Sequence, residues 1–329
     1  MSNQIKISVI IPIYNAERYI ERCVRSLMEQ TMKKNIEFIF VNDCTPDKSI
    51  TLLKNIIKEY PNRTEQITII ENTKNMGPSD SRKIAINTAK GEYIACCDSD
   101  DWIEPEMYET MYQATNQGNI DIVVCNYRVE EGNQSRNCIF IPSSTPQDAL
   151  AMLHECSYFP YAMWNQLIRR KYILEQIEYI IPTRIREDTY LMMRVYYHAK
   201  NISFVPGVYY HYFYENSTSL VHNYDDSYQA WLIQKRNMDN ITEMLYQTAE
   251  GYKEYHYAMN NFKYARKIDY KNAFSNLKQF YNEYRETHGD FVLCDSKKYH
   301  SSLSYLKLKL IYDTNYFIFN LYHSLTQTK

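Results

Sequence analysis

Three aspartates, at positions 98, 100 and 101, lie within four residues of one another. Their carboxylates repel one another unless a proton or a cation neutralises them. Mg²⁺ and Mn²⁺ favour carboxylate oxygens, and such sites commonly bind diphosphates through a few carboxylates and the metal. Asp98 and Asp100 therefore predict a divalent cation site. The alternative is an acidic loop that caps a helix beginning near Pro105.

Three further side chains have types that suit a nucleotide. Asp43 follows the apolar run 36–41 and can accept an N–H from a base, although aspartate is also common in turns. Tyr14, after Pro12, offers a ring for base stacking, or it is an ordinary loop aromatic. Arg82 can pair with a phosphate or with the acids, or it can remain a surface arginine.

The pair Glu187 and Asp188 opens a stretch with the character of a helix, 189–198. Locally this is an acidic cap at a helix N-terminus, where the helix dipole favours negative charge. Only long-range context can give either residue another role.

The remaining pattern predicts the elements that hold these residues. The first 125 residues alternate β-rich runs with helical periodicity, which is typical of a parallel sheet covered by helices. Strands are expected at 6–13, 36–41, 67–71, 92–97 and 120–125. In open sheets of this class ligands bind at the carboxyl ends of the strands, which is where Tyr14, Asp43 and Asp98 fall.

Helix signals accompany these strands. Apolar residues repeat at three and four over 20–27 and 52–57, as on one buried helix face. Asp47 and Ser79 are expected to cap the second and third helices, and Pro105 suits the first turn of a fourth.

Beyond residue 126 the pattern changes. Turn-rich residues at 130–137 favour an excursion or a strand pair, and 202–214 has the character of a strand. We expect one domain at 1–222, made of a first half at 1–125 and a second half at 126–222. A helical, tyrosine-rich region is expected at 223–329.

Composition excludes several classes of protein. Only 7 of the 329 residues are glycine, and none of their spacings forms a dinucleotide or P-loop motif, so side chains and metal must hold any nucleotide. A net charge of −2 argues against nucleic acid as a partner. The 8 cysteines form no C-x-x-C, and no signal peptide or apolar span of about 18 to 20 residues is evident, so a cytoplasmic location is expected.

Taken together, these segments resemble the family 2 inverting glycosyltransferases, which have a GT-A nucleotide-diphosphosugar fold. The similarity depends on the order and spacing of short motifs. They are Ser8–Asn15, Gln30–Thr31, Val41–Asp47, Asn75–Gly77 with Ser81–Arg82, Ala89–Ile94 and Asp98–Pro105. A looser match, to Trp164–Arg170, Glu187–Asp188 and Tyr209–Tyr212, resembles bacterial polysaccharide-building members. The similarity covers about two thirds of the chain.

The resemblance implies transfer of a sugar from a nucleotide-diphosphosugar, with UDP favoured, to a hydroxyl of a glycan or lipid-linked saccharide. It implies that the donor is held by Pro12, Tyr14, Asn15, Asp43, Arg82, Asp98, Ser99 and Asp100. Asp98 and Asp100 would bind Mn²⁺ or Mg²⁺, with His211 or His222 as a further ligand. Asp188 would be the general base, supported by Glu187.

The same resemblance makes 1–222 the catalytic domain, with a nucleotide-sugar half at 1–125 and an acceptor half at 126–222. It places Asp101, Trp164 and Asn165 on the acceptor side. The chain departs from the family at Lys83, where asparagine is common, and at Pro78 after Gly77. The alternative function is a catalytically silent carbohydrate-binding or assembly protein on the same fold.

The tail at 303–325 carries apolar residues at spacings that suit an amphipathic helix. Such a helix can rest on the inner face of the cell membrane as a peripheral contact, which would suit a lipid-linked acceptor. Packing against the catalytic domain is the alternative.

Overall fold

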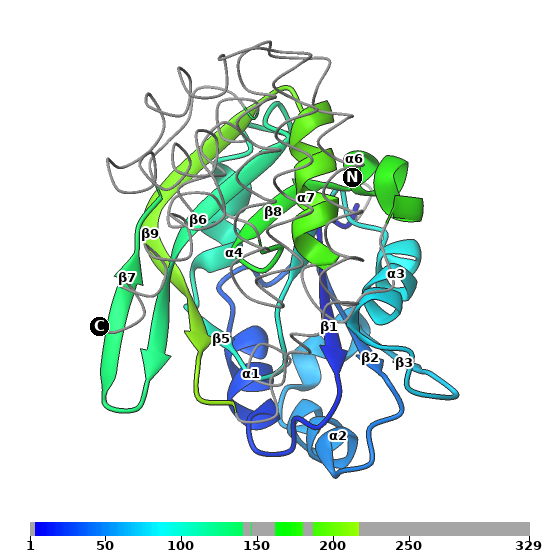
Figure 1. Cartoon of the computed structure of the whole chain (residues 1–329). Helices are drawn as coiled ribbons and strands as arrows, with labels where there is room; N and C mark the ends of the chain where they lie inside the picture. Colours follow the sequence, from blue (N-terminus) through cyan, green and yellow to red (C-terminus); the bar gives the residue numbers. More distant parts are fainter. Residues whose placement is uncertain (1–3, 141–145, 147–161, 180–186, 217–329) are drawn as a thin grey trace, which may run out of the picture. The chain divides into compact units, whose positions relative to one another are not determined.

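The computed structural model describes residues 4–140, 146, 162–179 and 187–216 (Figure 1). All lie in the first of two units into which the chain divides, Met1–Leu150 with Ser157–Tyr224. The expected region 223–329, with its tail at 303–325, and His222 lie outside the described residues. Among the helices described, none is both long enough and apolar enough to cross a membrane.

The first half of the sheet is parallel. Its strands are β1 (Ile7–Ile13), β2 (Ile36–Asn42), β3 (Ile67–Glu71) and β4 (Tyr93–Cys96), in the order β3-β2-β1-β4. Their bounds lie within one residue of the expected strands. The connections contain α1 (Ile20–Met28), α2 (Ser49–Lys58), the 3₁₀ helix η1 (Pro61–Gln66) and α3 (Pro78–Thr88).

The second half continues the same sheet in the order β4-β8-β6-β9-β5, and β7 pairs with β6. β6 is longer than the expected strand, and with β7 it forms a strand pair around the turn-rich segment. The elements are β5 (Trp102–Ile103), α4 (Met107–Gln113), β6 (Ile122–Glu131), β7 (Gln134–Cys138), β8 (Gln166–Arg169), α6 (Arg170–Gln176), η3 (Ile177–Tyr179), α7 (Glu187–His198) and β9 (Ile202–Phe213).

The two halves are joined by β8, which is antiparallel both to β4 and to β6. β6 and β9 are parallel, with register shifts on either side of Asn126. The short strand β5 follows the acidic loop and pairs antiparallel with β9, so that Trp102 lies opposite His211. Residues about 100 positions apart in sequence are therefore neighbours.

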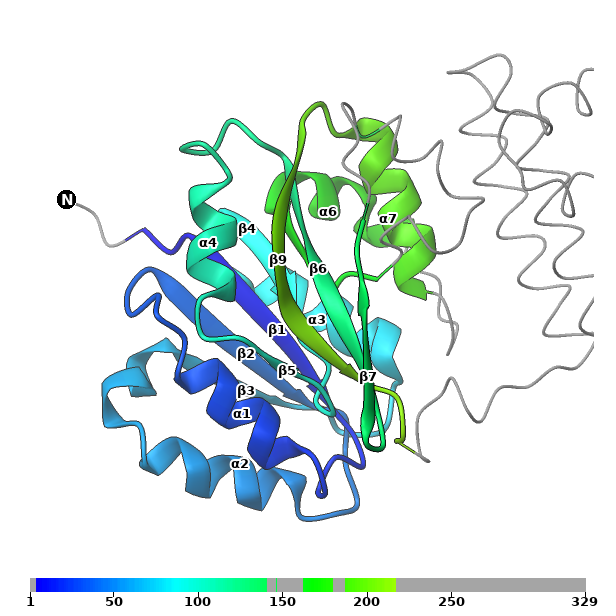
Figure 2. The same cartoon turned by 90° about the vertical axis from the view of Figure 1, so that its left-hand side faces the viewer.

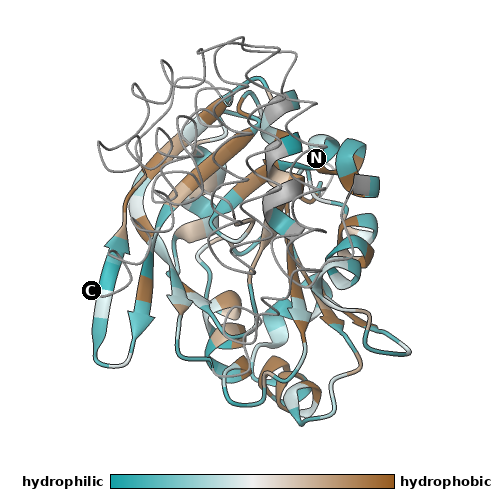
Figure 3. Ribbon diagram, in the orientation of Figure 1, coloured by the Kyte–Doolittle hydropathy of each residue, from teal (hydrophilic) through white to brown (hydrophobic). Residues whose placement is uncertain are grey.

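Alternating side chains give the sheet two apolar faces. Ile7, Val9 and Ile11 of β1 belong to one buried cluster with residues of α1, α2 and α4. Ile10 and Ile94 are also buried but lie outside that cluster, on the opposite face of the sheet. α3 and α6 cover this opposite face (Figure 2). Apolar residues line the central strands, whereas β7 at the edge is polar and exposed (Figure 3).

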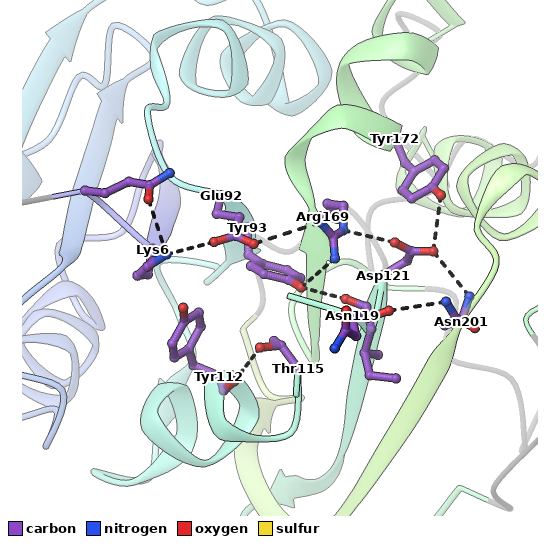
Figure 4. Close-up of polar contacts among 12 residues, drawn as sticks. Lys6, Glu92, Tyr93, Tyr112, Thr115, Asn119, Asp121, Arg169, Tyr172 and Asn201 are labelled. Atoms are coloured by element: carbon purple, nitrogen blue, oxygen red, sulfur yellow. Dashed lines mark hydrogen bonds and ion pairs between the residues drawn. The ribbon is translucent and has the colours of Figure 1, made fainter. Parts of the chain in front are cut away.

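A network of charges joins the strands at the end of the sheet away from the acidic loop (Figure 4). Asp121, 4% exposed, lies 2.9 Å from Arg169 Nε and accepts a hydrogen bond of 3.1 Å from the Tyr172 hydroxyl. It also accepts bonds from the amides of Lys200 and Asn201. Asp121 therefore ties the start of β6 to β8, α6 and the start of β9.

The expected helix caps were only partly right. Ser79 is wrong as a cap, because α3 already begins at Pro78, after Gly77 with its φ of 87°. Pro105 lies before α4, which begins at Met107. Asp47 lies one residue before the cap position of α2, but its carboxylate accepts from the Ser49 amide at 3.1 Å.

Candidate active site

The acidic residues form a tight turn directly after β4. The amide of Asp101 donates to the carbonyl of Asp98 at 3.1 Å and closes the turn. At the same edge of the sheet, the amide of Asp43 after β2 donates to the carbonyl of Ile13 at 3.0 Å. Because the strands are parallel, their carboxyl ends bring the segments at Tyr14, Asp43 and Asp98 to one edge.

Arg82 and Asp98 form an ion pair. Arg82 Nη2 donates to Asp98 Oδ1 at 2.8 Å, and the side chains are 10% and 26% exposed. Arg82 projects from the second turn of α3 onto the loop after β4. The pair brings together two residues expected to contact the nucleotide, and it partly offsets the charge of the acidic turn.

Asp100 lies in the middle of the turn. Its Oδ2 accepts a hydrogen bond of 2.7 Å from Asn216 Nδ2, and its carbonyl accepts one of 3.1 Å from Arg22 Nη2. Burial, and then the nearby charge of Asp98, raises the pKa of the Asp100 carboxyl above its ordinary value. The ionised turn therefore carries unfavourable negative charge that a cation would relieve.

These two carboxylates fit a Mg²⁺ or Mn²⁺ ion by their chemistry. The described contacts occupy Oδ1 of Asp98 and Oδ2 of Asp100, which leaves one oxygen on each side chain. Hard oxygen donors of this kind, completed by water and phosphate oxygens, suit both ions. Among the described residues, no group of three His, Cys, Asp or Glu side chains is arranged to hold a metal by itself.

Asp101 differs from its two neighbours. It is fully buried, and its oxygens accept from the Tyr210 hydroxyl at 2.6 Å and from the Phe213 amide at 2.7 Å. Burial, then the charges of Asp100 and Asp98, raise the pKa of this carboxyl well above its ordinary value. Both oxygens bond within the protein in this arrangement, and the expected acceptor contact stays a prediction.

Asn165, also expected on the acceptor side, is buried as well, and its acceptor role stays a prediction. It is 1% exposed, and its Nδ2 donates to the Cys125 carbonyl at 2.9 Å inside the sheet. Trp164 beside it is partly buried and stacks on Tyr210, with ring centroids 4.4 Å apart. Trp164 therefore supports the aromatic group that holds Asp101.

The residues expected around the base have contrasting surroundings. Tyr14 is 45% exposed, as a ring open for stacking would be. Asp43 is 3% exposed and accepts from Asn72 Nδ2 and from the amides of Met76 and Gly77, at 2.8 to 2.9 Å. Asp43 therefore holds the loop that precedes α3, which is a role the sequence did not indicate.

The other three residues expected at the donor, Pro12, Asn15 and Ser99, lie at or after the same strand ends. Pro12 is the sixth residue of β1, and Ser99 lies partly buried in the acidic turn. Asn15 has a φ of 51°, and its amide donates to Thr45 Oγ1 at 2.9 Å. Asn15 therefore links the loops after β1 and β2.

His211 has both ring nitrogens engaged. Nδ1 lies 2.7 Å from Glu130 and Nε2 lies 2.8 Å from Glu104, and the ring stacks on Trp102 at 4.8 Å. Carboxylates engage both nitrogens in this arrangement, and the metal-ligand role of His211 stays a prediction. The histidine joins β5, β6 and β9.

Glu187 and Asp188 are the first two residues of α7, so the helix begins slightly before the expected residue. Asp188 is partly buried. α7 packs on α6, which in turn packs on α3, the helix that carries Arg82. α7, which carries the expected general base Asp188, thus lies on the same face of the sheet as α3.

Sequence reasoning missed three residues that shape this site, namely Asn72, Tyr210 and Asn216. Asn72 had a signal, because it directly follows an expected strand. Tyr210 lies in the loosely matched segment Tyr209–Tyr212, which gave it no specific role, and Asn216 had no signal. Each contacts the acidic turn from more than 100 positions away.

Comparison with known proteins identifies the family. The family model described as "Glycosyl transferase family 2" matches residues 8–178, just over half of the chain. The chain belongs to glycosyl transferase family 2. The match includes the segments at Tyr14, Asp43, Arg82 and Asp98, whereas α7 and β9 lie beyond it.

Curated relatives of this family 2 chain match a portion of it. EpsH of Bacillus subtilis is 34% identical over 215 residues, which are 63% of the chain and 60% of EpsH. The poly(ribitol-phosphate) beta-glucosyltransferase of Bacillus spizizenii is 33% identical over 202 residues, 60% of the chain and 30% of that protein. The chain thus spans 60% or less of the length of these relatives.

Solved structures show that this family 2 chain has the GT-A fold. TarS of S. aureus, in complex with UDP-GlcNAc, aligns with a TM-score of 0.69 at 19% identity, over 93% of the chain and 87% of TarS. The mannosyltransferase PcManGT of Pyrobaculum calidifontis, in complex with GDP-Man and Mn²⁺, aligns with a TM-score of 0.53 at 12% identity, over 89% of the chain and 86% of PcManGT.

Proposed function

We propose that this family 2 chain is an inverting, metal-dependent glycosyltransferase. It moves a sugar from a UDP-sugar to a hydroxyl of a glycan or lipid-linked saccharide, in the synthesis of a bacterial cell-surface polysaccharide. The observation that carries the proposal is the Arg82–Asp98 pair beside Asp100, at the strand ends where Tyr14 and Asp43 also lie.

The donor's base would occupy the ends of β1 and β2. The exposed ring of Tyr14 suits stacking on a planar base. Asp43 already accepts three hydrogen bonds, but its Oδ2 accepts only one of them and can take another from the imide N–H of uracil. UDP is the proposed nucleotide because TarS, which shares the fold, binds UDP-GlcNAc.

The diphosphate would meet the acidic turn. Asp98 and Asp100 would hold Mn²⁺ or Mg²⁺, and the Mn²⁺ in the PcManGT complex supports this choice of ion. The bound ion would neutralise charge on the departing diphosphate. Arg82 adds a fixed positive charge beside the same oxygens, and its planar fork suits phosphate. Side chains and the metal would thus hold the diphosphate, a role that the backbone amides of a glycine-rich loop have in other nucleotide-binding proteins.

The acceptor hydroxyl is a poor nucleophile until its proton is removed. Asp188 would take that proton as the oxygen attacks the anomeric carbon, while the bond from that carbon to the diphosphate oxygen breaks. Because the base and the leaving group lie on opposite faces of the sugar, the configuration inverts. Glu187 would support Asp188.

The test measures UDP release from UDP-sugars with Mn²⁺ and a saccharide acceptor. Asp188→Asn should lower the transfer rate roughly 10² to 10⁴-fold and leave donor affinity unchanged, since a general base contributes about that much. Asp100→Asn should weaken Mn²⁺-dependent donor binding. Glu175→Gln, an exposed carboxylate on α6, is the control and should change neither.

Two results would contradict the proposal in different ways. Transfer at the wild-type rate by Asp188→Asn would mean that another group is the base. Binding of saccharide without any transfer, across a panel of nucleotide sugars, would favour the silent carbohydrate-binding alternative. A melting-temperature screen of the panel identifies the donor, because a ligand of the native state raises the transition.

Two further features stay predictions of this proposal. The helical region 223–329 would be separate from the catalytic domain at 1–222, and its tail at 303–325 would give peripheral contact with the membrane. Flotation of the full chain with anionic liposomes tests this contact, and a chain ending near residue 295 is the comparison. Equal flotation of the two would remove the membrane role of the tail.

A further inference from the structure

The end of β9 holds the acidic turn at both of its ends. The Tyr210 hydroxyl donates to Asp101 Oδ2 at 2.6 Å and accepts from the amide of Asp98 at 3.2 Å. Tyr210 is fully buried, so water does not compete for these bonds. One hydroxyl therefore fixes the first and the last residue of the turn that contains Asp100.

Asn216, three residues beyond β9, reaches the middle of the same turn. Its Nδ2 donates to Asp100 Oδ2 at 2.7 Å, and the residue is 7% exposed. A hydrogen bond to one oxygen fixes the rotation of a carboxylate and hence the direction of the other oxygen. The bond at Oδ2 therefore sets where Asp100 Oδ1 points.

The chemistry of the asparagine suits an orienting role. A lysine at this position would neutralise Asp100 and compete with a cation, whereas a neutral amide leaves the carboxylate its full charge. Carboxylates that bind metals are commonly held by such outer hydrogen bonds, and loss of one typically costs roughly 10- to 100-fold in metal affinity.

The strand that carries these groups is itself held in register. β5 pairs with β9, placing Trp102 opposite His211 and Ile103 opposite Tyr210. His211 bridges Glu104 and Glu130, which fixes β9 between β5 and β6. The positions of Tyr210 and Asn216 are thus set by the sheet.

We propose that Asn216 and Tyr210 are positioning residues for the divalent cation, which they serve by aiming the carboxylates of Asp100 and Asp98. This inference rests on the proposed function and adds residues beyond the matched family segment 8–178. Neither residue needs to touch the ion, since each acts through a carboxylate or through the backbone of the turn.

The test is Mn²⁺ binding to the full chain without donor, followed by electron paramagnetic resonance of the free ion. Asn216→Ala and Tyr210→Phe should each bind Mn²⁺ roughly 10- to 100-fold more weakly than wild type. Melting temperatures without metal should stay close to wild type for Asn216→Ala, which separates aiming from folding. Tyr108→Phe is the matched control, because Tyr108 is a buried tyrosine whose hydroxyl has no hydrogen-bond partner among the described residues.

The outcomes separate this inference from the proposed function. If wild type binds Mn²⁺ and both variants bind it equally well, the positioning role is overturned while the cation site stands. If Tyr108→Phe weakens binding as much as Tyr210→Phe, the effect is one of packing and the role of Tyr210 is overturned. If wild type binds no Mn²⁺ either alone or with UDP present, the cation site of the proposed function fails and this inference fails with it.

Discussion

Arg82 Nη2 lies 2.8 Å from Asp98 Oδ1, and this contact joins the second turn of α3 to the loop after β4. The guanidinium is largely shielded from water, so its charge acts on Asp98 with little screening. In the proposed reaction, the same group would lie beside the diphosphate. One position of Arg82 would thus serve both the acidic turn and the donor.

Replacing Arg82 by lysine should weaken donor binding although the charge is kept. Lysine lacks the planar fork that matches a phosphate or carboxylate, and a lost charge-assisted hydrogen bond costs about 1.5–3 kcal/mol. We expect the dissociation constant for UDP-sugar with Mn²⁺, measured by calorimetry, to rise roughly 10- to 100-fold. Lys83→Arg, at the neighbouring exposed pair with Glu178, is the control. Unchanged donor affinity in Arg82→Lys would show that a single positive charge at this position is enough for donor binding.

Asp43→Asn should loosen the loop at 72–77 even without a ligand. The carboxylate accepts from the amides of Met76 and Gly77, and an asparagine would turn an NH₂ group toward at least one donor. Hydrogen exchange at these two amides should become faster. Cys44 is an exposed neighbour of Asp43, and Cys44→Ser should leave the exchange rates of these amides unchanged. If these two amides exchanged in Asp43→Asn at the wild-type rate, the loop would keep its structure without the Asp43 carboxylate.

Asp47 should make folding stability depend on pH at the acidic end. Burial opposes its ionisation, but hydrogen bonds from Ser49, Thr45 and Glu17 outweigh burial and hold the pKa below the ordinary 3.8. A lowered folded-state pKa stabilises the protein above pH 3.8, and that stability is lost as the pH falls through the folded value.

The comparison is with Asp47→Asn, followed by urea unfolding at several pH values. At pH 7 the variant should be less stable by about 1 kcal/mol, as for loss of a helix cap. The difference should shrink below pH 3.8. A difference that stays constant with pH would show that shape rather than charge matters at this position.

Asp121→Ala should destabilise the protein more than loss of a surface ion pair. Removing one partner of a buried ion pair leaves the other charge, here that of Arg169, without its partner. Such a loss typically costs about 3–5 kcal/mol. Lys54→Ala, in the exposed pair with Glu71, should cost less than about 1 kcal/mol. Denaturant unfolding of both variants gives the comparison. Similar losses would mean that water already reaches the Asp121 network.

Local pattern predicted the parallel half of the sheet well. The strands before Tyr14, Asp43 and Asp98 are apolar runs bounded by polar turns, and such runs mark buried strands by themselves. Ser79 was misread because proline at the preceding position also starts a helix, and Gly77 supplies the positive φ before it.

The second half depends on contacts that no local pattern encodes. Nothing in residues 166–169 indicates that they insert antiparallel between β4 and β6. For the same reason the burial of Asp101 could not be predicted, since a short acidic run does not show which carboxylate faces inward. Tyr210 falls in the matched segment Tyr209–Tyr212, but it is one of 33 tyrosines and nothing local distinguishes it from its neighbours.

The insertion of β8 also limits where the chain can be cut. β4 has β1 on one side and β8 on the other, and β8 comes about 70 residues later in the sequence. A fragment ending at residue 125 would leave one side of β4 with unpaired backbone amides and carbonyls, an edge that invites association with other chains. We therefore expect residues 1–125, the half predicted to bind the nucleotide sugar, not to fold as an independent unit.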